Sequence, residues 1–209
     1  MPPRPGHGTT GLGIDTYPPF LDIARARAVE LGVGDRVSFE AADAAAFDPG
    51  RGPFDVVSCI GATWIGGGLG GTLELLRRSL APGGWVLVGE VFWAEEPPAT
   101  LRAAEEHSQR FFDLPGTLDV VERAGFELVE MVLASNDDWD RYSARQWLAV
   151  REWVDAHPGD PQGPELTRLT DESRRTYLSH LRRCMGWGVF VLKEGAPSSS
   201  ERRPPGGRG

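Results

Sequence analysis

The 209-residue sequence lacks features that mark several large classes of protein. It holds two cysteines, Cys59 and Cys184, which are far apart and lie in apolar runs, so neither a disulfide framework nor metal-ligand spacing is present. We expect both to be buried thiols of a reducing compartment. No stretch reaches the ~18 apolar residues of a membrane span, and the N-terminus lacks the apolar centre of a signal peptide. These absences predict a soluble, cytoplasmic protein.

Basic residues are also few, with 22 Lys and Arg against 30 Asp and Glu, for a net charge of −8. No basic stripe with interleaved aromatic residues is present, which argues against nucleic acid as a primary partner. His107, His157 and His180 lack the spacing of metal ligands, so we expect no metal site. The pattern favours no particular oligomeric state.

The stretch GHGTTGLGID, residues 6–15, matches G-x-G-x-x-G at Gly6, Gly8 and Gly11. A phosphate-binding loop of this type needs a hydrophobic strand before it and a helix after it. Residues 1–5, MPPRP, are too rich in proline for a central strand, and residues 11–15 have the pattern of a short buried strand. We therefore predict that these glycines form an ordinary loop.

From residue 11 onward, short apolar runs alternate with helical stripes. Strands are expected at 12–15, 36–41, 54–60, 85–90, 125–133 and 187–193, and helices at 18–31, 72–80 and 118–124. Pro82, Gly83 and Gly84 are expected to stop the second helix. The alternation predicts an α/β fold with a doubly wound sheet, in which ligands bind at the carboxyl ends of the strands.

The expected domain organisation is a loop or disordered segment at 1–10, one domain at 11–193 and a disordered tail at 194–209. Within the domain, residues 137–184 form a helical cap insertion before the last strand. It contains two long helical patterns separated by the breaker cluster at 157–161.

Two carboxylates end predicted strands. Asp15 follows the first strand and has the position to accept hydrogen bonds from ribose hydroxyls; the alternative is that it caps the next helix. Asp43 follows the second strand and has the position to accept from an exocyclic amine; the alternative is a loop carboxylate in water.

Taken together, five segments resemble the class I S-adenosylmethionine-dependent methyltransferases. They are GLGIDTYPPFLDIARARAVELGVGDRVSFEAADAAAF, FDVVSCIGATWIGGG, LRRSLAPGGWVLVGE, ERAGFELVE and GWGVFVLKE, in the family's order. The resemblance implies a Rossmann-like methyltransferase sheet with helices on both faces and S-adenosyl-L-methionine as cofactor. It also implies methyl transfer to a small-molecule acceptor. The implied cofactor-binding residues are Asp15 and Thr16 at the ribose, Asp43 and Ala44 at the adenine, and Ile60, Gly61 and Ala62 at the methionine part.

On the acceptor side, the resemblance implies that Trp64 borders the transferable methyl group, where a cation meets an aromatic face; core packing is the alternative. Glu90, with Trp93 after it, is the candidate general base if the acceptor must lose a proton, and a cap or solvated carboxylate is the alternative. Trp139 and Tyr142 begin the cap insertion and are candidate acceptor contacts, with helix packing as the alternative.

In the resembled family, a first strand with its Gly-x-Gly loop precedes the strand that ends here at Asp15. We expect this chain to lack that first βα unit, which leaves unpaired strand edges, low stability and impaired cofactor binding. Two other functions are considered. One is a catalytically inactive binding or interaction protein of the methyltransferase fold. The other is a nicotinamide-dependent oxidoreductase, which is disfavoured because a usable glycine loop and a Tyr-Lys pair are absent.

Overall fold

The computed structural model describes residues 8–47, 53–105 and 110–195. The chain divides into two compact units, Met1–Arg51 and Gly52–Gly209, and each is described by itself. Residues 1–7 of the predicted N-terminal loop and 196–209 of the predicted tail lie outside the described residues. Glu194, assigned to the tail from sequence, instead belongs to the last strand.

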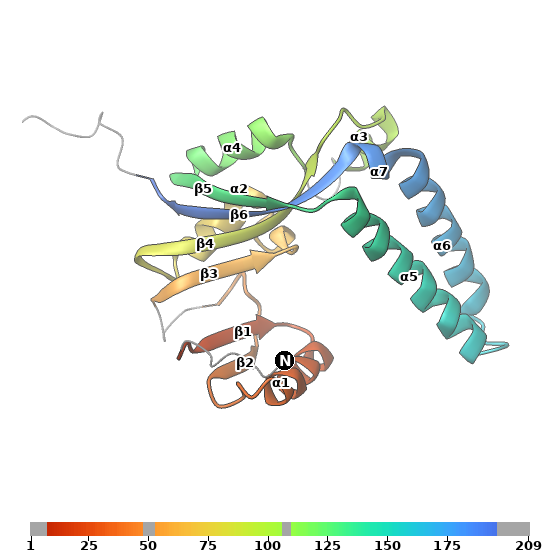
Figure 1. The fold of residues 1–209 in the computed structure, drawn as a ribbon, viewed down its shortest axis with the longest axis horizontal. Coiled ribbons are helices and arrows are strands. Elements are labelled where there is room, and N and C mark those ends of the chain that lie inside the picture. The colour runs from red at the N-terminus through yellow and green to blue at the C-terminus, as the bar shows by residue number, and fades with distance from the viewer. Residues whose placement is uncertain (1–7, 48–52, 106–109, 196–209) are drawn as a thin grey trace, which may run out of the picture. The chain divides into compact units, whose positions relative to one another are not determined.

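The first unit is a strand–helix–strand motif (Figure 1). Strands β1 (Gly11–Asp15) and β2 (Val37–Ala41) pair in parallel, with Asp15 opposite Ala41. Helix α1 (Pro18–Glu30) begins with two prolines, whose missing N–H groups cost nothing in a first turn. It ends before Gly32, whose φ of +67° is left-handed. These three elements confirm the pattern predicted from sequence.

The N-terminal glycine motif is an ordinary loop in the described residues. Gly8 has a φ of +70°, Gly11 begins β1, and a strand, not a helix, follows it. Gly6 lies outside the described residues. The prediction of an ordinary loop is therefore confirmed for Gly8, whereas Gly11 is the first residue of β1.

The second unit is built on a four-stranded sheet in the order β3-β4-β6-β5. Strand β3 (Phe54–Ile60) is parallel to β4 (Leu80–Trp93), and β6 (Met185–Glu194) is antiparallel to both β4 and β5 (Phe126–Leu133). Helices α2 (Leu69–Arg77) and α4 (Leu114–Arg123) contact the sheet and each other, and a short helix α3 (Ala99–Glu105) follows β4. This mixed architecture confirms the predicted α/β class. Among the described residues, β1 pairs only with β2 and β3 only with β4.

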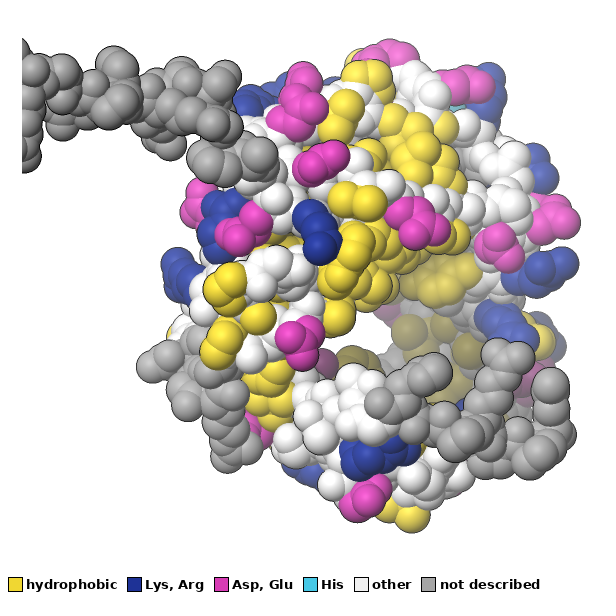
Figure 2. Space-filling model, turned by 60° about the vertical axis from the view of Figure 1, so that its left-hand side comes forward, with side chains coloured by type: hydrophobic (Ala, Val, Ile, Leu, Met, Phe, Trp, Pro, Cys, Tyr) yellow, Lys and Arg dark blue, Asp and Glu magenta, His cyan; other side chains and the backbone are white. Residues whose placement is uncertain are grey.

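The core of the second unit lies between its sheet and helices α2 and α4. Alternate strand residues point to this side, because successive side chains in a strand face opposite ways. The buried cluster comprises Val57, Val86, Val88, Phe92, Phe126, Phe190 and Leu192 from the sheet, Leu69 and Leu73 from α2, and Val121 from α4. On the opposite side, Val56 and Ile60 stay about half exposed. In the view of Figure 2, hydrophobic side chains gather over this unit, whereas acidic and basic side chains are intermixed.

Strand β4 differs most from the expectation, because it runs from Leu80 to Trp93. Phe54 pairs with Leu80, but Val56 pairs with Trp85, so residues 81–84 bulge out of the ladder. The Pro-Gly-Gly turn is therefore an irregularity inside the strand, and α2 ends earlier, at Arg77.

Helix α2 also begins earlier than expected and includes part of the glycine-rich segment. A Cβ on Gly71 would lie 2.0 Å from the carbonyl oxygen of Gly66. Only glycine permits that approach of the two backbones. Helix α4 likewise begins at Leu114, since Asp113 caps it by accepting the Gly116 N–H at 2.8 Å.

The predicted cap insertion is a helical hairpin. Helix α5 (Asn136–Ala156) and helix α6 (Gly163–Thr176) run side by side beyond the end of the sheet (Figure 1). The chain returns through a π-helical turn (Tyr177–Leu181) and a short helix α7 (Arg182–Cys184). The breaker cluster separates α5 from α6 as predicted. Ser135 and Asp138 form a reciprocal capping box at the start of α5.

A hydrogen-bonded network joins the two ends of the hairpin. The Tyr177 hydroxyl donates to Asp140 Oδ1 at 2.8 Å, and Arg182 donates to both Asp140 oxygens at 2.9 and 3.0 Å. These bonds, Arg182 first, hold the pKa of the Asp140 carboxyl below its ordinary value. Burial of Tyr177 and its bond to Asp140 raise the pKa of the phenol to about 12. The network fastens α5 to the segment that follows α6.

This network predicts a loss of stability at high pH. The folded-state pKa of Tyr177 exceeds the ~10 of an unfolded tyrosine, so its stabilising effect is complete below pH ~10 and is lost as the pH rises through ~12. We expect Tyr177→Phe to flatten the fall in unfolding free energy over that range, measured by urea denaturation. Tyr142→Phe, at an exposed tyrosine, should keep the native slope. If the unfolding free energy falls with pH equally in the native chain and in Tyr177→Phe, Tyr177 is not the cause of the fall.

Candidate functional site

The two carboxylates of the first unit lie at the same edge of its sheet. Asp15 ends β1, and Asp43 follows the end of the neighbouring parallel strand β2. Asp15 Oδ1 accepts the Tyr17 N–H at 2.7 Å, and Asp43 Oδ1 accepts the Ala45 N–H at 2.9 Å. The N-cap of α1 is Tyr17, without a side-chain cap, so Asp15 does not cap that helix. Each carboxylate is instead oriented by a short turn of its own.

The neighbours of these carboxylates leave that edge of the sheet accessible. Thr16 is exposed beside Asp15, and Ala44 is half-buried beside Asp43. A carboxylate with one oxygen held by the backbone can accept further hydrogen bonds from hydroxyl or amino groups. The edge therefore has the chemistry to hold a ribose and an exocyclic amine, which fits the adenosine part of the cofactor implied by sequence.

In the second unit, Ile60 ends β3, and the segment after it, Gly61 and Ala62, continues into a 3-10 turn (Thr63–Gly66). Gly61 has a φ of +73° and donates its N–H to the Gly89 carbonyl at 3.0 Å. This bond extends the β3–β4 ladder by one residue beyond Ile60. Ile60 remains about half exposed.

Trp187 lies against the candidate site, and it was not singled out from the sequence. A Cβ on Gly61 would lie 3.1 Å from the Trp187 ring, and one on Gly89 would lie 2.7 Å from it. The indole therefore packs directly on the backbone of both glycines. A glycine directly after β3 and another within β4 are a signal of such close approach, but the sequence does not reveal which side chain fills the space.

On the other face of the sheet, Glu90 is buried beneath the 3-10 turn. Its Oε2 accepts the Thr63 hydroxyl at 2.5 Å, and its Oε1 accepts the Val91 N–H at 2.8 Å. Burial raises the pKa of the nearby Cys59 thiol; a backbone hydrogen bond with Ala62 lowers it, and the negative charge of Glu90 raises it further. Glu90 is thus neither a solvated carboxylate nor a helix cap. Cys59 and Cys184 are buried free thiols, as predicted.

The aromatic candidates differ in exposure. Trp64 is 65% exposed, so the alternative that it packs in the core is wrong. Trp93 is buried, with its ring centroid 6.3 Å from that of Phe111 and 5.6 Å from the Arg102 guanidinium. These positions leave Trp64, not Trp93, open to a ligand.

Trp139 and Tyr142 form an edge-to-face pair at the start of α5, with ring centroids 5.6 Å apart. Tyr142 is 58% exposed, so much of its ring remains open to solvent. The buried indole N–H of Trp139 has no hydrogen-bond partner in the described part of the chain. A buried donor without a partner costs free energy, and a bound ligand can remove that cost.

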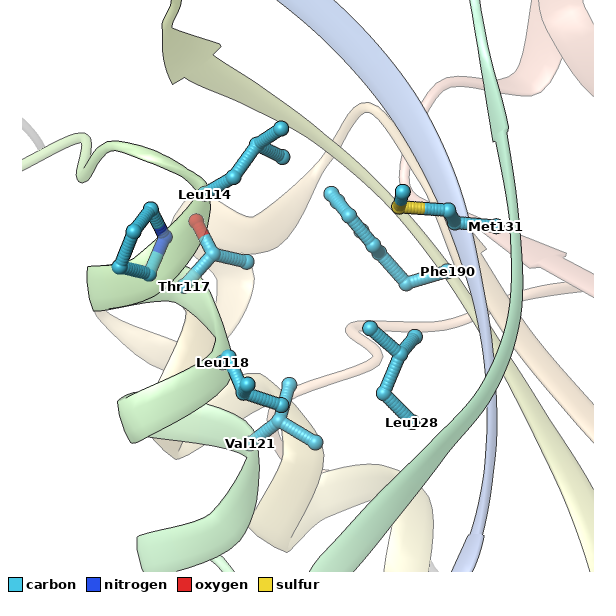
Figure 3. Close-up of a pocket in the computed structure, with 8 residues that line it drawn as sticks. Leu114, Thr117, Leu118, Val121, Leu128, Met131 and Phe190 are labelled. Atoms are coloured by element: carbon cyan, nitrogen blue, oxygen red, sulfur yellow. The ribbon is translucent and has the colours of Figure 1, made fainter.

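A separate cavity lies between α4 and strands β5 and β6, with a volume of about 310 Å³ (Figure 3). Leu114, Thr117, Leu118 and Val121 of α4 point toward Leu128, Met131 and Phe190 across it. The lining is apolar apart from one threonine hydroxyl. It therefore lacks the polar groups that a nucleotide requires.

Two further expectations concern the whole chain. Within 8–47, 53–105 and 110–195, no group of three or more His, Cys, Asp or Glu residues could hold a metal ion. None of the described helices is long and apolar enough to span a membrane.

Comparisons with known proteins show the family to which this chain belongs. Residues 5–84 match the model of a methyltransferase domain. The uncharacterized protein YjhP of Escherichia coli (strain K12) is 43% identical over 190 residues, which cover 89% of this chain and 76% of that protein.

Two solved structures are similarly close, and both are titled as S-adenosylmethionine-dependent methyltransferases in complex with S-adenosyl-L-homocysteine. The one from Geobacter sulfurreducens is 43% identical with a TM-score of 0.82, covering 90% of this chain and 76% of that chain. The one from Thiobacillus denitrificans is 41% identical with a TM-score of 0.81, covering 90% and 77%.

The fold is that of a Rossmann-like methyltransferase. This chain belongs to the class I S-adenosylmethionine-dependent methyltransferase family, and the family's cofactor is S-adenosylmethionine. The resemblance identified from sequence is therefore confirmed. The chain spans about three quarters of the length of these relatives.

Gly61 provides a test of the site in the second unit. Gly61→Ala and Gly159→Ala each place a Cβ at a positive φ, but only the first meets another side chain, because nothing lies within 4 Å of Gly159. Both should lower the unfolding free energy by about 1–2 kcal/mol. Only Gly61→Ala should also weaken binding of S-adenosylhomocysteine, measured by isothermal titration. Equal affinities in the two variants would remove Gly61 from the site.

Proposed function

We propose that this protein transfers a methyl group from S-adenosylmethionine to a small-molecule acceptor. The observation that carries the proposal is the set of strand ends in each unit: carboxylates at Asp15 and Asp43 in one, and the Gly61 backbone beneath Trp187 in the other. These occur in a chain of the S-adenosylmethionine-dependent methyltransferase family.

In this proposal, Asp15, with Thr16 beside it, binds the ribose hydroxyls, and Asp43 with Ala44 binds the adenine. Ile60, Gly61 and Ala62 contact the methionine part. The small Gly61 allows the backbone to approach the ligand closely, and its left-handed φ turns the chain into the 3-10 turn.

The bound cofactor supplies a methyl group on a positively charged sulfur, and the thioether that remains after transfer is a good leaving group. The protein's main contribution is then to align the acceptor and exclude water, which can supply ~7–11 kcal/mol in favourable cases. The exposed Trp64 offers an aromatic face to a cationic sulfur. A general base is needed only for an acceptor that must lose a proton. Glu90 was the sequence candidate for that role.

The acceptor site is proposed at the start of α5. The Trp139 N–H without a partner favours an acceptor that carries a hydrogen-bonding oxygen or nitrogen, and the exposed Tyr142 ring favours an apolar or aromatic body. The intermixed charges of Figure 2 agree with a small acceptor in place of a nucleic acid. Trp93, which is buried, is proposed as support for this side of the site and not as a direct contact.

Titration of the full chain with S-adenosylmethionine, and separately with a nicotinamide dinucleotide, tests the function. We expect binding of the first alone, and formation of S-adenosylhomocysteine with at least one class among phenols, amines, carboxylic acids and thiols. Binding without turnover of any class would favour the inactive binding protein. Binding of the dinucleotide alone would favour the oxidoreductase.

Asp15→Ala tests the ribose contact. Hydrogen bonds to a charged group contribute about 1.5–3 kcal/mol each, so the variant should bind S-adenosylmethionine at least tenfold more weakly in isothermal titration. Asp22→Ala removes an exposed carboxylate from α1 in the same unit and is the matched control, with native affinity expected. Native affinity combined with a lower melting temperature in Asp15→Ala would limit Asp15 to orienting Tyr17.

A further inference from the structure

A chain of buried hydrogen bonds ties the segment after β3 to two other elements of the second unit. Thr63, Thr72 and Glu90 are each at most 5% exposed. The Thr72 hydroxyl, on α2, donates to the Thr63 carbonyl at 2.7 Å, and the Thr63 hydroxyl donates to Glu90 on β4 at 2.5 Å. Thr63 is therefore held from both sides, directly after Gly61 and Ala62.

The carboxylate of Glu90 faces away from the proposed methionine contacts. Along β4, Glu90 has the same parity as Val86, Val88 and Phe92, whose side chains belong to the core cluster beneath α2 and α4. Trp187, which covers Gly61 and Gly89, lies on the other side of the sheet. Both Glu90 oxygens already accept hydrogen bonds, one from Thr63 and one from Val91. This geometry suits a structural acceptor better than a general base.

We infer that Glu90 is a positioning residue, which acts through Thr63 to fix the Gly61–Ala62 segment for the methionine part of the cofactor. The inference rests on the proposed function. It assigns Glu90 a role in cofactor affinity and not in proton transfer. A buried charged acceptor makes a strong hydrogen bond, so its loss frees the segment that the bond restrains.

Three variants test the inference by titration of the full chain with S-adenosylhomocysteine. Thr63→Val removes the hydroxyl at constant shape and should weaken binding at least tenfold. Thr63→Ser keeps the hydroxyl and should stay within about threefold of the native affinity. Glu90→Gln should also stay near native affinity, because its amide can accept from Val91 and donate to the Thr63 oxygen.

The matched control is Thr117→Val, which makes the same change at a buried threonine of α4 beside the apolar cavity. It should leave the affinity unchanged, which separates a site effect from a general loss of stability. If Thr63→Val does not fold, Thr72→Val supplies the test, since it releases the Thr63 carbonyl. We expect weaker binding there too.

Each outcome is decisive. Native affinity in a folded Thr63→Val, or in Thr72→Val where Thr63→Val is unfolded, overturns the inference. So does a Glu90→Gln variant that binds normally but loses methyl transfer, because that identifies Glu90 as a base. Failure of the native chain to bind S-adenosylhomocysteine would instead contradict the proposed function itself.

Discussion

Parallel pairing of β3 with β4 brings Ile60 and Gly89 side by side as the last pair of their ladder, and the candidate site of the second unit follows from that pairing. The Gly61 N–H continues the ladder by one bond to the Gly89 carbonyl. Because neither glycine has a Cβ, the indole of Trp187 can pack on both. The first unit follows the same rule, since parallel β1 and β2 bring Asp15 and the turn of Asp43 to one edge. Polar groups gather where parallel strands end.

The two faces of the four-stranded sheet then differ in chemistry around Gly89 and Glu90 of β4. One face has the backbone of Gly61 and Gly89 beneath an aromatic ring, and the other has a buried carboxylate bonded to Thr63. A buried charge is tolerated only when hydrogen bonds replace the water it has lost. Glu90 meets that condition with a hydroxyl and a backbone N–H. The cost of burying Glu90 therefore enforces the position of the segment that supplies its partner.

Local pattern was sufficient to predict the α/β class, the order of strands and helices, and both strand-end carboxylates, because period and breaker residues are encoded in neighbouring positions. Features that depend on pairing between distant segments were not accessible in this way. The sequence suggested that Pro82 to Gly84 stop a helix, whereas pairing of Leu80 with Phe54 places them in a bulge of β4. Trp187 was missed because its register opposite Val91 is set by the sheet. The hydrogen bond between Thr63 and Glu90 joins residues 27 positions apart, and no local sequence pattern predicts it.

If methyl transfer depends on the alignment of acceptor and cofactor, the residues that bind the acceptor must be held rigidly as well as have the right chemistry. The hairpin of α5 and α6 extends beyond the sheet, so the start of α5, with Trp139 and Tyr142, must be fixed by contacts other than those of the sheet. Asp140 supplies one, since it follows Trp139 directly and is bonded to both Tyr177 and Arg182. A bidentate arginine–carboxylate pair fixes orientation as well as distance. The start of α5 is therefore fixed in place, and the acceptor site proposed there is separate from the strand ends proposed to bind the cofactor.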